Sequence, residues 1–299
     1  MDNNSLISII IRVKNEEAFI GRCLDAVFQQ KSPIPFEVVI VFDETSTDNT
    51  RAIIQRYPVR IIKLQEYIPK YTMPKAMNVG IREAKGDIIV MLSGDAIPLS
   101  DSWLATLIGP FKDHKVAAVG GRMVPRNNCY PMEKRRVLSA FSDEERMNWI
   151  LPFAGCAVRK SVLEQFPIRE DLRCGEDKEL KKRIIDAGYF IPYLPNAAVE
   201  HSHNMSLKRH FLIGMKRGQS YNKQGFLPPE LTSLTNTSVF IVLIIPRFIN
   251  NLFKKVWDDY KYIKQNKEEP KWYLWAWPYE MSFLVGHYIG PIYYRNRLP

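Results

Sequence analysis

The first half of the chain alternates short apolar runs with segments in which apolar residues recur every three or four positions. The runs at 6–13, 36–42 and 87–92 are apolar at nearly every position, which is typical of strands buried on both faces of a sheet. The segments at 18–29 and 75–84 have helical spacing instead. Strands that alternate with helices of about ten residues predict an α/β fold with a central, mostly parallel sheet flanked by helices.

The pattern changes after residue 204, where amphipathic helices with many aromatic residues and lysines follow one another. A turn-rich stretch at 225–229 marks a loose boundary. We therefore predict a domain over 1–225 that holds the sheet, and a helical, aromatic-rich appendage over 226–299. The polar and strongly charged residues 122–150 are interpreted as a mobile or substrate-facing segment.

Composition and charge limit the partners without choosing one. A chain of 299 residues with 46% apolar content can bury one large core or two modest ones. Its formal charge of +10, from 42 basic and 32 acidic residues, favours nucleic acid, a nucleotide diphosphate or an anionic membrane surface. Neither a stacking platform nor a recognised nucleic-acid motif accompanies this charge, so nucleic acid is the least favoured partner.

Cysteine usage and hydropathy bear on the compartment. The cysteines are widely spaced and form no CxxC pair, which argues against a zinc site or disulfides and favours a cytoplasmic protein: Cys23, Cys129, Cys156 and Cys174. No apolar run reaches the roughly 20 residues that a membrane span needs. The basic and aromatic residues beyond 225, such as Lys254 and Trp257, suit a peripheral contact with the cytoplasmic face of a membrane. A packed subdomain or a homodimer contact explains them equally well.

Carboxylates follow two of the predicted strands at the point where each strand ends. Asp43 comes directly after the run at 36–42, and Asp95 follows Ser93 and Gly94 after the run at 87–92. Ligands of α/β sheets bind at the carboxyl ends of the strands. Asp43 is suited to accept a hydrogen bond from the imide N–H of uracil or thymine, and Asp95 to bind a divalent metal. Gly94 leaves room for a phosphate beside the backbone.

A carboxylate pair and a histidine pair complete the candidate chemistry. Glu176 and Asp177 begin a helical pattern, where acidic residues can simply complement the helix dipole. As catalysts, Asp177 would deprotonate an acceptor hydroxyl attacking an anomeric carbon, and Glu176 would orient the base or hold that hydroxyl. His201 and His203 lie two residues apart after a strand, so we expect one, preferably His201, to face the cleft as a metal or phosphate ligand. Surface or core histidines are the alternative.

Several motifs in order resemble glycosyltransferase family two, the inverting enzymes with the GT-A fold. They are the segments 9–17, 41–50, 75–80, 84–87 and 175–177, and the resemblance covers roughly residues 5–215. It implies Asp177 and Glu176 as catalytic residues and a site for Mg or Mn formed by Asp95, His201 and His203. It also implies contacts with a nucleoside-diphosphate sugar from Arg12, Asn15, Glu16, Asp43, Lys75, Asn78, Ser93 and Gly94.

Within that family the segments 92–98 and 201–207 are most similar to bacterial rhamnosyltransferases, which implies a dTDP-rhamnose donor. One departure concerns the metal. The usual Asp-x-Asp begins here with Ser93, so only Asp95 offers a carboxylate, and we expect weak metal affinity.

The leading hypothesis is a metal-dependent transferase that moves a sugar from a nucleoside-diphosphate donor to a hydroxyl of a glycan or lipid-linked acceptor in a single displacement. Ser93 motivates an alternative, a nucleotide-sugar-binding module without turnover. A nucleotidyltransferase is a further alternative, but the segment 12–17 lacks the glycines of a phosphate-binding loop.

Overall fold

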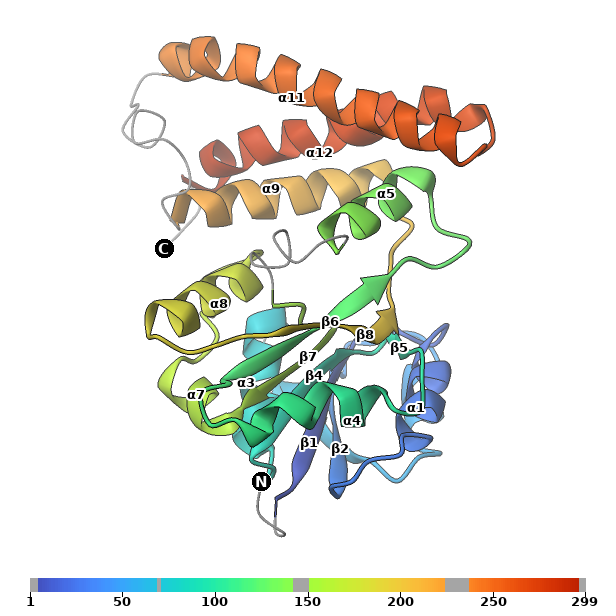
Figure 1. The fold of residues 1–299 in the computed structure, drawn as a ribbon. Coiled ribbons are helices and arrows are strands. Elements are labelled where there is room, and N and C mark those ends of the chain that lie inside the picture. The colour runs from blue at the N-terminus through green and yellow to red at the C-terminus, as the bar shows by residue number, and fades with distance from the viewer. Residues whose placement is uncertain (1–4, 69–70, 142–150, 224–236, 296–299) are drawn as a thin grey trace. The chain divides into compact units, whose positions relative to one another are not determined.

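The computed structural model describes residues 5–68, 71–141, 151–223 and 237–295 (Figure 1). The chain divides into two compact units. The first comprises residues 1–126, 137–170 and 176–202, and the second comprises 127–136, 171–175 and 203–299. The boundary predicted at 225 lies outside the described residues.

The first unit is built on one eight-stranded sheet with the order β3-β2-β1-β4-β7-β6-β8-β5. Strands β1, β2, β3 and β4 are parallel, but β7 runs antiparallel to both β4 and β6, and β5 runs antiparallel to β8. The sheet is therefore mixed, with a parallel half as predicted. The strands are β1 (Ile7–Val13), β2 (Phe36–Phe42), β3 (Arg60–Lys63), β4 (Ile88–Ser93), β5 (Ile97–Pro98), β6 (Ala118–Val124), β7 (Gly155–Arg159) and β8 (Tyr193–Glu200).

Helices cover both faces of this sheet, which explains why its strands are apolar at nearly every position. In β1, Ile9 and Ile11 enter one core and Ile10 enters the other, as the two-residue period of a strand requires. Each fully buried isoleucine contributes about 1.5–3 kcal/mol. The first core includes α1 (Ile20–Phe28), α2 (Thr50–Ile54) and α4 (Trp103–Ile108), and the second includes α3 (Met73–Glu83), α7 (Lys160–Gln165) and α8 (Glu176–Asp186). One-turn 3₁₀ helices lie at Leu64–Glu66 and Gly109–Lys112.

The second unit consists of long helices. They are α9 (Leu207–Lys223), α11 (Thr237–Gln265), α12 (Lys271–Arg295) and the first part of α5 (Pro131–Ala140). Glycines let α9 and α12 approach closely, because a Cβ at Gly214 would collide with the carbonyl of Phe283 and one at Gly286 with the carbonyl of Phe211. Within the described residues, no helix is long and apolar enough to cross a bilayer.

The charged segment 122–150 is only partly described. Its first residues complete β6, and Pro131–Ala140 form the helix α5. Residues 142–150 lie outside the described part of the chain, so a substrate-facing role for them stays a prediction.

Candidate functional site

The ends of β4 and β8 bring together the residues predicted to bind a metal. Asp95 lies two residues beyond β4 and is 5% exposed, and His201 directly follows β8. The Nε2 atom of His201 lies 3.3 Å from Oδ1 of Asp95. One ligand atom each from Asp95, His201 and His203 lies within 4.8 Å of the other two. Only one of the two histidines was expected to face the cleft, but both lie beside Asp95, because β8 ends at Glu200 and the alternation of a strand stops there.

Arg126 joins these ligand-bearing segments, and it was not among the predicted site residues. Its buried guanidinium donates hydrogen bonds to the backbone carbonyls of Asp95 and Ser202. It also lies 3.7 Å from Oδ2 of Asp95, 3.6 Å from Oε1 of Glu200 and 3.9 Å from the ring centroid of Phe19. Arg126 therefore offsets two carboxylates and fixes the end of β4 against the segment after β8.

Only a weak signal in the sequence pointed to Arg126. It follows a strand, as Asp43 and Asp95 do, but it lies in a segment with many other cations. Its contacts come from residues far away in the chain, so the local pattern could not single it out.

Arg12, near the end of β1, is hydrogen-bonded to the end of β4 and acts electrostatically on the start of α8. Its guanidinium donates to Oγ of Ser93 at 2.9 Å and to the hydroxyl of Tyr71 at 3.4 Å. The positive charge of Arg12 also acts on Glu176 and lowers the pKa of that carboxyl, although burial outweighs this effect. Ser93, which stands at the first position of the usual Asp-x-Asp, therefore has the cation of Arg12 beside it.

Glu176 and Asp177 begin α8, directly after Gly175, whose φ of 81° favours glycine. Burial first, and then the charge of Asp177, raise the pKa of Glu176 to about 7. Burial and the charge of Asp177 also raise the pKa of Cys156, which lies on β7 opposite Met91 of β4. The carboxylate pair therefore lies over the centre of the sheet, within electrostatic reach of Arg12.

The raised pKa of Glu176 predicts a stability that falls with pH. Between pH 4.5 and about 7 the folded chain keeps a proton on Glu176 that the unfolded chain releases. The free energy of unfolding therefore decreases as pH rises through this window, by roughly 3 kcal/mol from this group. Glu176→Gln should remove that decrease in urea unfolding measured from pH 4.5 to 7.5. Glu179→Gln, on the same helical turn, should keep the wild-type slope, and a Glu176→Gln slope equal to the wild-type slope would contradict the assignment.

Asp43 lies at the end of β2 with its carboxylate already engaged. Lys14 Nζ lies 2.6 Å from Oδ2, and Oδ1 accepts hydrogen bonds from Thr45 and, at 2.7 Å, from Gln65. Burial alone would raise the pKa of Asp43, but these donors outweigh it and lower the pKa. Lys14 and Gln65 were not predicted as site residues. Base recognition by Asp43 stays a prediction and would require an exchange of one of these donors.

Three further predicted residues connect the loops at this edge. Asn15 has a φ of 53°, which asparagine tolerates, and its Oδ1 accepts from the backbone N–H of Thr47 at 2.8 Å. The backbone N–H of Glu16 donates to Oγ1 of Thr50 at 2.8 Å. A Cβ at Gly94 would lie 3.3 Å from the Cγ of Glu16, so a side chain there would require Glu16 to shift slightly. Their contacts with a donor sugar stay predictions.

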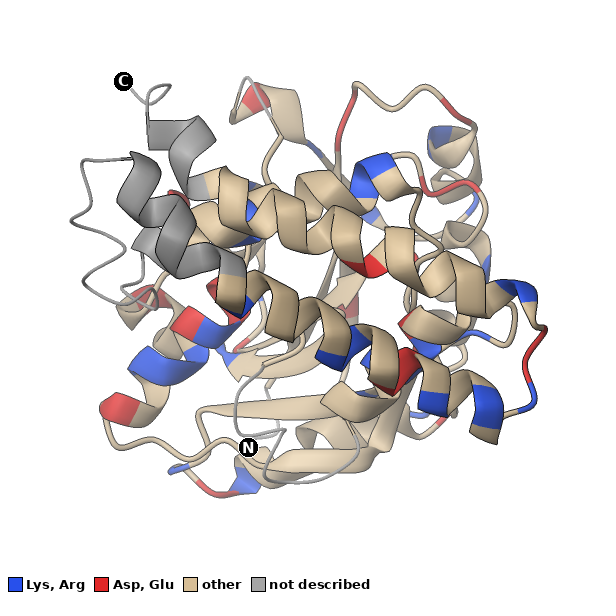
Figure 2. Ribbon diagram, turned by 90° about the horizontal axis from the view of Figure 1, so that it is seen from above, with Lys and Arg blue, Asp and Glu red and all other residues tan. Residues whose placement is uncertain are grey.

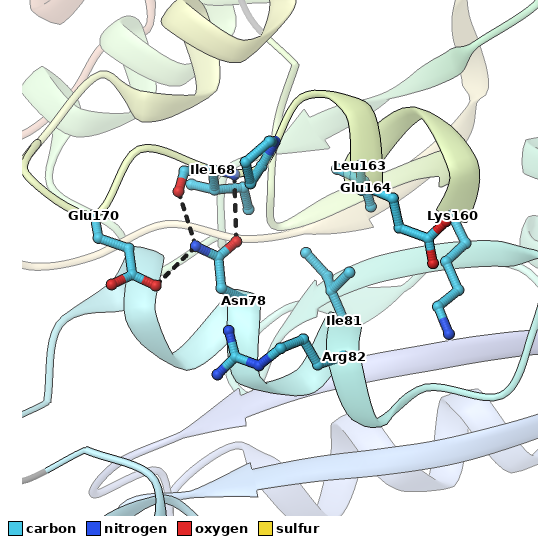
Figure 3. A pocket seen from close by; sticks show the side chains of 9 residues that line it. Asn78, Ile81, Arg82, Lys160, Leu163, Glu164, Ile168 and Glu170 are labelled. Atoms are coloured by element: carbon cyan, nitrogen blue, oxygen red, sulfur yellow. Dashed lines mark hydrogen bonds between the residues drawn. The ribbon is translucent and has the colours of Figure 1, made fainter.

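Lys75 and Asn78 lie on α3, and the contacts of Asn78 lead away from the metal ligands. Asn78 donates to the carbonyl of Ile168 at 2.8 Å and to Oε1 of Glu170 at 3.0 Å (Figure 3). It lines a pocket of about 560 Å³ with Arg82 and other residues of α3, α7 and the segment 167–170. Lys75 lies in the first turn of α3, where its backbone N–H donates to Oγ1 of Thr72 at 3.4 Å. Donor contacts of both residues stay predictions.

The set of groups at this edge is suited to phosphate and hydroxyl chemistry. Asp95, His201 and His203 offer one oxygen and two nitrogens to a cation. Such a mixed set fits Mn²⁺ better than Mg²⁺, which prefers an all-oxygen shell. Arg12 adds a fixed positive charge, and Asp177 adds a carboxylate that can accept a proton.

Known proteins are similar to this chain in sequence. The O-antigen chain rhamnosyltransferase WbaN of Salmonella anatum is 30% identical over 200 residues, which make up 62% of this chain and 62% of WbaN. The O-antigen chain rhamnosyltransferase RfbN of Salmonella typhimurium is 27% identical over 222 residues, or 69% of each chain. This chain thus spans less than two thirds of WbaN.

The fold has close structural counterparts. The mannosyltransferase PcManGT from Pyrobaculum calidifontis, solved with GDP-Man and Mn²⁺, gives a TM-score of 0.62 at 18% identity over 98% of this chain and 89% of that one. This likeness identifies the fold as GT-A. A profile of glycosyl transferase family 2 matches residues 8–168, more than half of the chain. From this match and the ordered motifs, we conclude that the chain belongs to glycosyl transferase family 2.

Proposed function

We propose that the protein transfers a sugar from a nucleoside-diphosphate donor to a hydroxyl of its acceptor, with inversion at the anomeric carbon. The observation that carries this proposal is that Arg12 interacts both with the end of β4 and with the start of α8. Arg12 is hydrogen-bonded to Ser93, two residues before Asp95, and acts electrostatically on Glu176, next to Asp177. These contacts support a base and a diphosphate site at one edge of the sheet. Family membership argues against the nucleotidyltransferase alternative.

In the proposed reaction the acceptor oxygen forms a bond to the anomeric carbon while the bond from that carbon to the diphosphate oxygen breaks. Asp177 accepts the proton of the attacking hydroxyl. Glu176, protonated below about pH 7, orients that hydroxyl through a hydrogen bond. The nucleoside diphosphate leaves with the electron pair, beside the positive charge of Arg12.

A divalent cation would be held by Asp95, His201 and His203, and when bound it would neutralise charge on the diphosphate. We favour Mn²⁺ because two of the three ligands are imidazoles. The solved structures of PcManGT and of a mycobacterial glucosyl-3-phosphoglycerate synthase also contain Mn²⁺. Arg126 serves as a positioning residue, because it contacts Asp95 and the backbone next to His201.

For the donor we propose dTDP-rhamnose, and for the acceptor a glycan or lipid-linked glycan. The support is the similarity to two proteins named O-antigen chain rhamnosyltransferases, WbaN and RfbN. The segment 201–207, which carries two of the proposed metal ligands, is part of that likeness. On this proposal the enzyme works in the cytoplasm, where nucleotide sugars are made.

Release of nucleoside diphosphate from a panel of dTDP-, UDP- and GDP-sugars tests the proposal. With crude lipid and glycan acceptors, we expect one donor to be consumed with Mn²⁺ and none with EDTA. His201→Gln should raise the Mn²⁺ concentration for half-maximal rate by about tenfold or more. The matched control is His114→Gln, an exposed histidine before β6, which should leave it unchanged.

Two outcomes would contradict the proposal. A donor that binds without any turnover would favour the binding-module alternative. Equal rates of donor consumption in Mn²⁺ and in EDTA would show that the reaction needs no metal, and would contradict the assigned metal site.

A further inference from the structure

Several large apolar side chains on α11 and α12 of the second unit are exposed. Phe253 and Trp257 of α11 are 58% and 60% exposed, and Leu274 of α12 is 81% exposed. Met281, also on α12, is 44% exposed. Together with Trp277 these residues are called the α11–α12 apolar surface. Clustered exposed aromatic and aliphatic side chains of this kind mark an interaction site.

The α11–α12 apolar surface is continuous across the two helices. Phe253 and Trp277 make an edge-to-face contact with ring centroids 5.3 Å apart. Tyr260 and Tyr273 make a second contact of this type at 5.2 Å, so the helices lie side by side in opposite directions. Leu274 and Met281 lie one turn to either side of Trp277 on α12. One flat partner could therefore contact all five residues.

Cations flank this surface on α11. Lys254, Lys261 and Lys264 lie three, four and seven residues from Trp257, which places them on the same side of the helix. The ammonium group of Lys261 lies 5.7 Å from the ring centroid of Trp257. Figure 2 looks onto α11 and α12, whose turns are mostly tan, with blue turns of lysine and arginine and fewer red turns of aspartate and glutamate. The surface thus combines apolar anchors with positive charge.

We propose that the α11–α12 apolar surface docks the protein on an anionic lipid bilayer. Tryptophan and phenylalanine insert at the boundary between headgroups and acyl chains, and neighbouring lysines bind the anionic headgroups. The helices lie in the plane of the interface, since no described helix is suited to cross it. The inference adds a partner to the proposed function, but it rests on the second unit alone.

Charge favours a bilayer over a second copy of the chain as the occupant. A two-fold contact would place the same patch on both sides, and so would bring two sets of the lysines Lys254, Lys261 and Lys264 into one interface. Like charges across an interface oppose association. An anionic membrane has the opposite sign.

Flotation with vesicles tests the proposal. Wild-type protein is mixed with vesicles of equal parts phosphatidylglycerol and phosphatidylcholine, and with phosphatidylcholine alone. We expect it to float with the anionic vesicles and to bind the neutral ones at least about tenfold more weakly. The double variant Trp257→Ser/Leu274→Ser should lose about tenfold or more in partitioning. The matched control is Phe190→Ser, because Phe190 is 59% exposed in the first unit, and it should bind as wild type does.

Substitutions of charged residues test the electrostatic contribution to vesicle binding. Lys254→Glu/Lys261→Glu should reduce binding to anionic vesicles by more than about tenfold, and Lys115→Glu in the first unit should not. Thermal unfolding of each variant checks that its fold is intact. Donor turnover with a soluble acceptor should be unchanged in all of them, so loss of docking and failure of the proposed function are distinguishable.

The proposal is overturned if wild-type protein does not float with anionic vesicles, or if the Trp257→Ser/Leu274→Ser variant floats equally well. It is also overturned if sedimentation shows a dimer that this variant dissociates while vesicle binding is absent. That result would assign the surface to a second copy of the chain.

Discussion

Asp177→Asn is expected to lower the rate of sugar transfer by about a thousandfold and to leave donor binding nearly unchanged. An amide has almost the same shape as the carboxylate but cannot accept the proton of the attacking hydroxyl, and general base catalysis contributes 10²- to 10⁴-fold. In the proposed function other groups hold the donor, such as Arg12 and the residues after β4. The measurement is the rate of diphosphate release at saturating donor and acceptor, with calorimetric titration of the donor.

The helix itself offers a control for this prediction. Asp186→Asn lies at the other end of α8, where the carboxylate is exposed and paired with Lys182 at 2.5 Å. This variant should transfer sugar at the wild-type rate. If Asp177→Asn retained more than about a tenth of the wild-type rate, another group would have to be the base. If it lost donor binding as well, the role of Asp177 would be structural.

Much of the parallel half of the fold follows from local pattern. The runs that form β1, β2 and β4 are buried on both faces, and such runs are visible in sequence because few polar residues interrupt them, such as Ser8 in β1 and Glu37 in β2. The direction of a strand, in contrast, does not follow from local pattern. Nothing in the run around Cys156 shows that β7 is antiparallel to β4, because strand direction depends on the connections before and after it.

The candidate site was predictable to the extent that it depends on strand ends. Asp95 and His201 are far apart in sequence and meet because they follow β4 and β8 in one sheet. Arg126 was missed because its partners are mainly backbone carbonyls, which leave no trace in the sequence. The contacts of Asn78 with the segment at 168–170 were missed for the same reason.

A buried ionic cluster in the second unit was likewise invisible to local pattern. Glu280 of α12 is fully buried, and its carboxylate lies 3.6 Å from Arg135, 3.4 Å from Arg136 and 3.4 Å from Lys255. The two arginines belong to α5 and the lysine to α11. One carboxylate therefore holds cations from two other helices.

Two other carboxylates also lie near these cations, and Glu133 is 3.1 Å from Arg136. Asp259 is also fully buried and lies 2.5 Å from Arg135, but burial and the charge of Glu280 raise its pKa to about 7. Burial first, and then the charge of Arg136, lower the pKa of His210 to about 4, so this ring is neutral. Among these carboxylates, Glu280 is the one for which contacts within 3.6 Å of Arg135, Arg136 and Lys255 are all seen.

Glu280→Ala is accordingly expected to lower the free energy of unfolding by about 3–5 kcal/mol, the usual cost of leaving buried charges without their partner. The measurement is urea unfolding followed by tryptophan fluorescence. Glu269→Ala is the matched control, because Glu269 is exposed and its ion pair with Lys271 lies at the surface, where a loss of less than about 1 kcal/mol is expected. Equal effects of the two substitutions would mean that water reaches the cations around Glu280. A large effect confined to Glu280 would show that this carboxylate holds α5, α11 and α12 together.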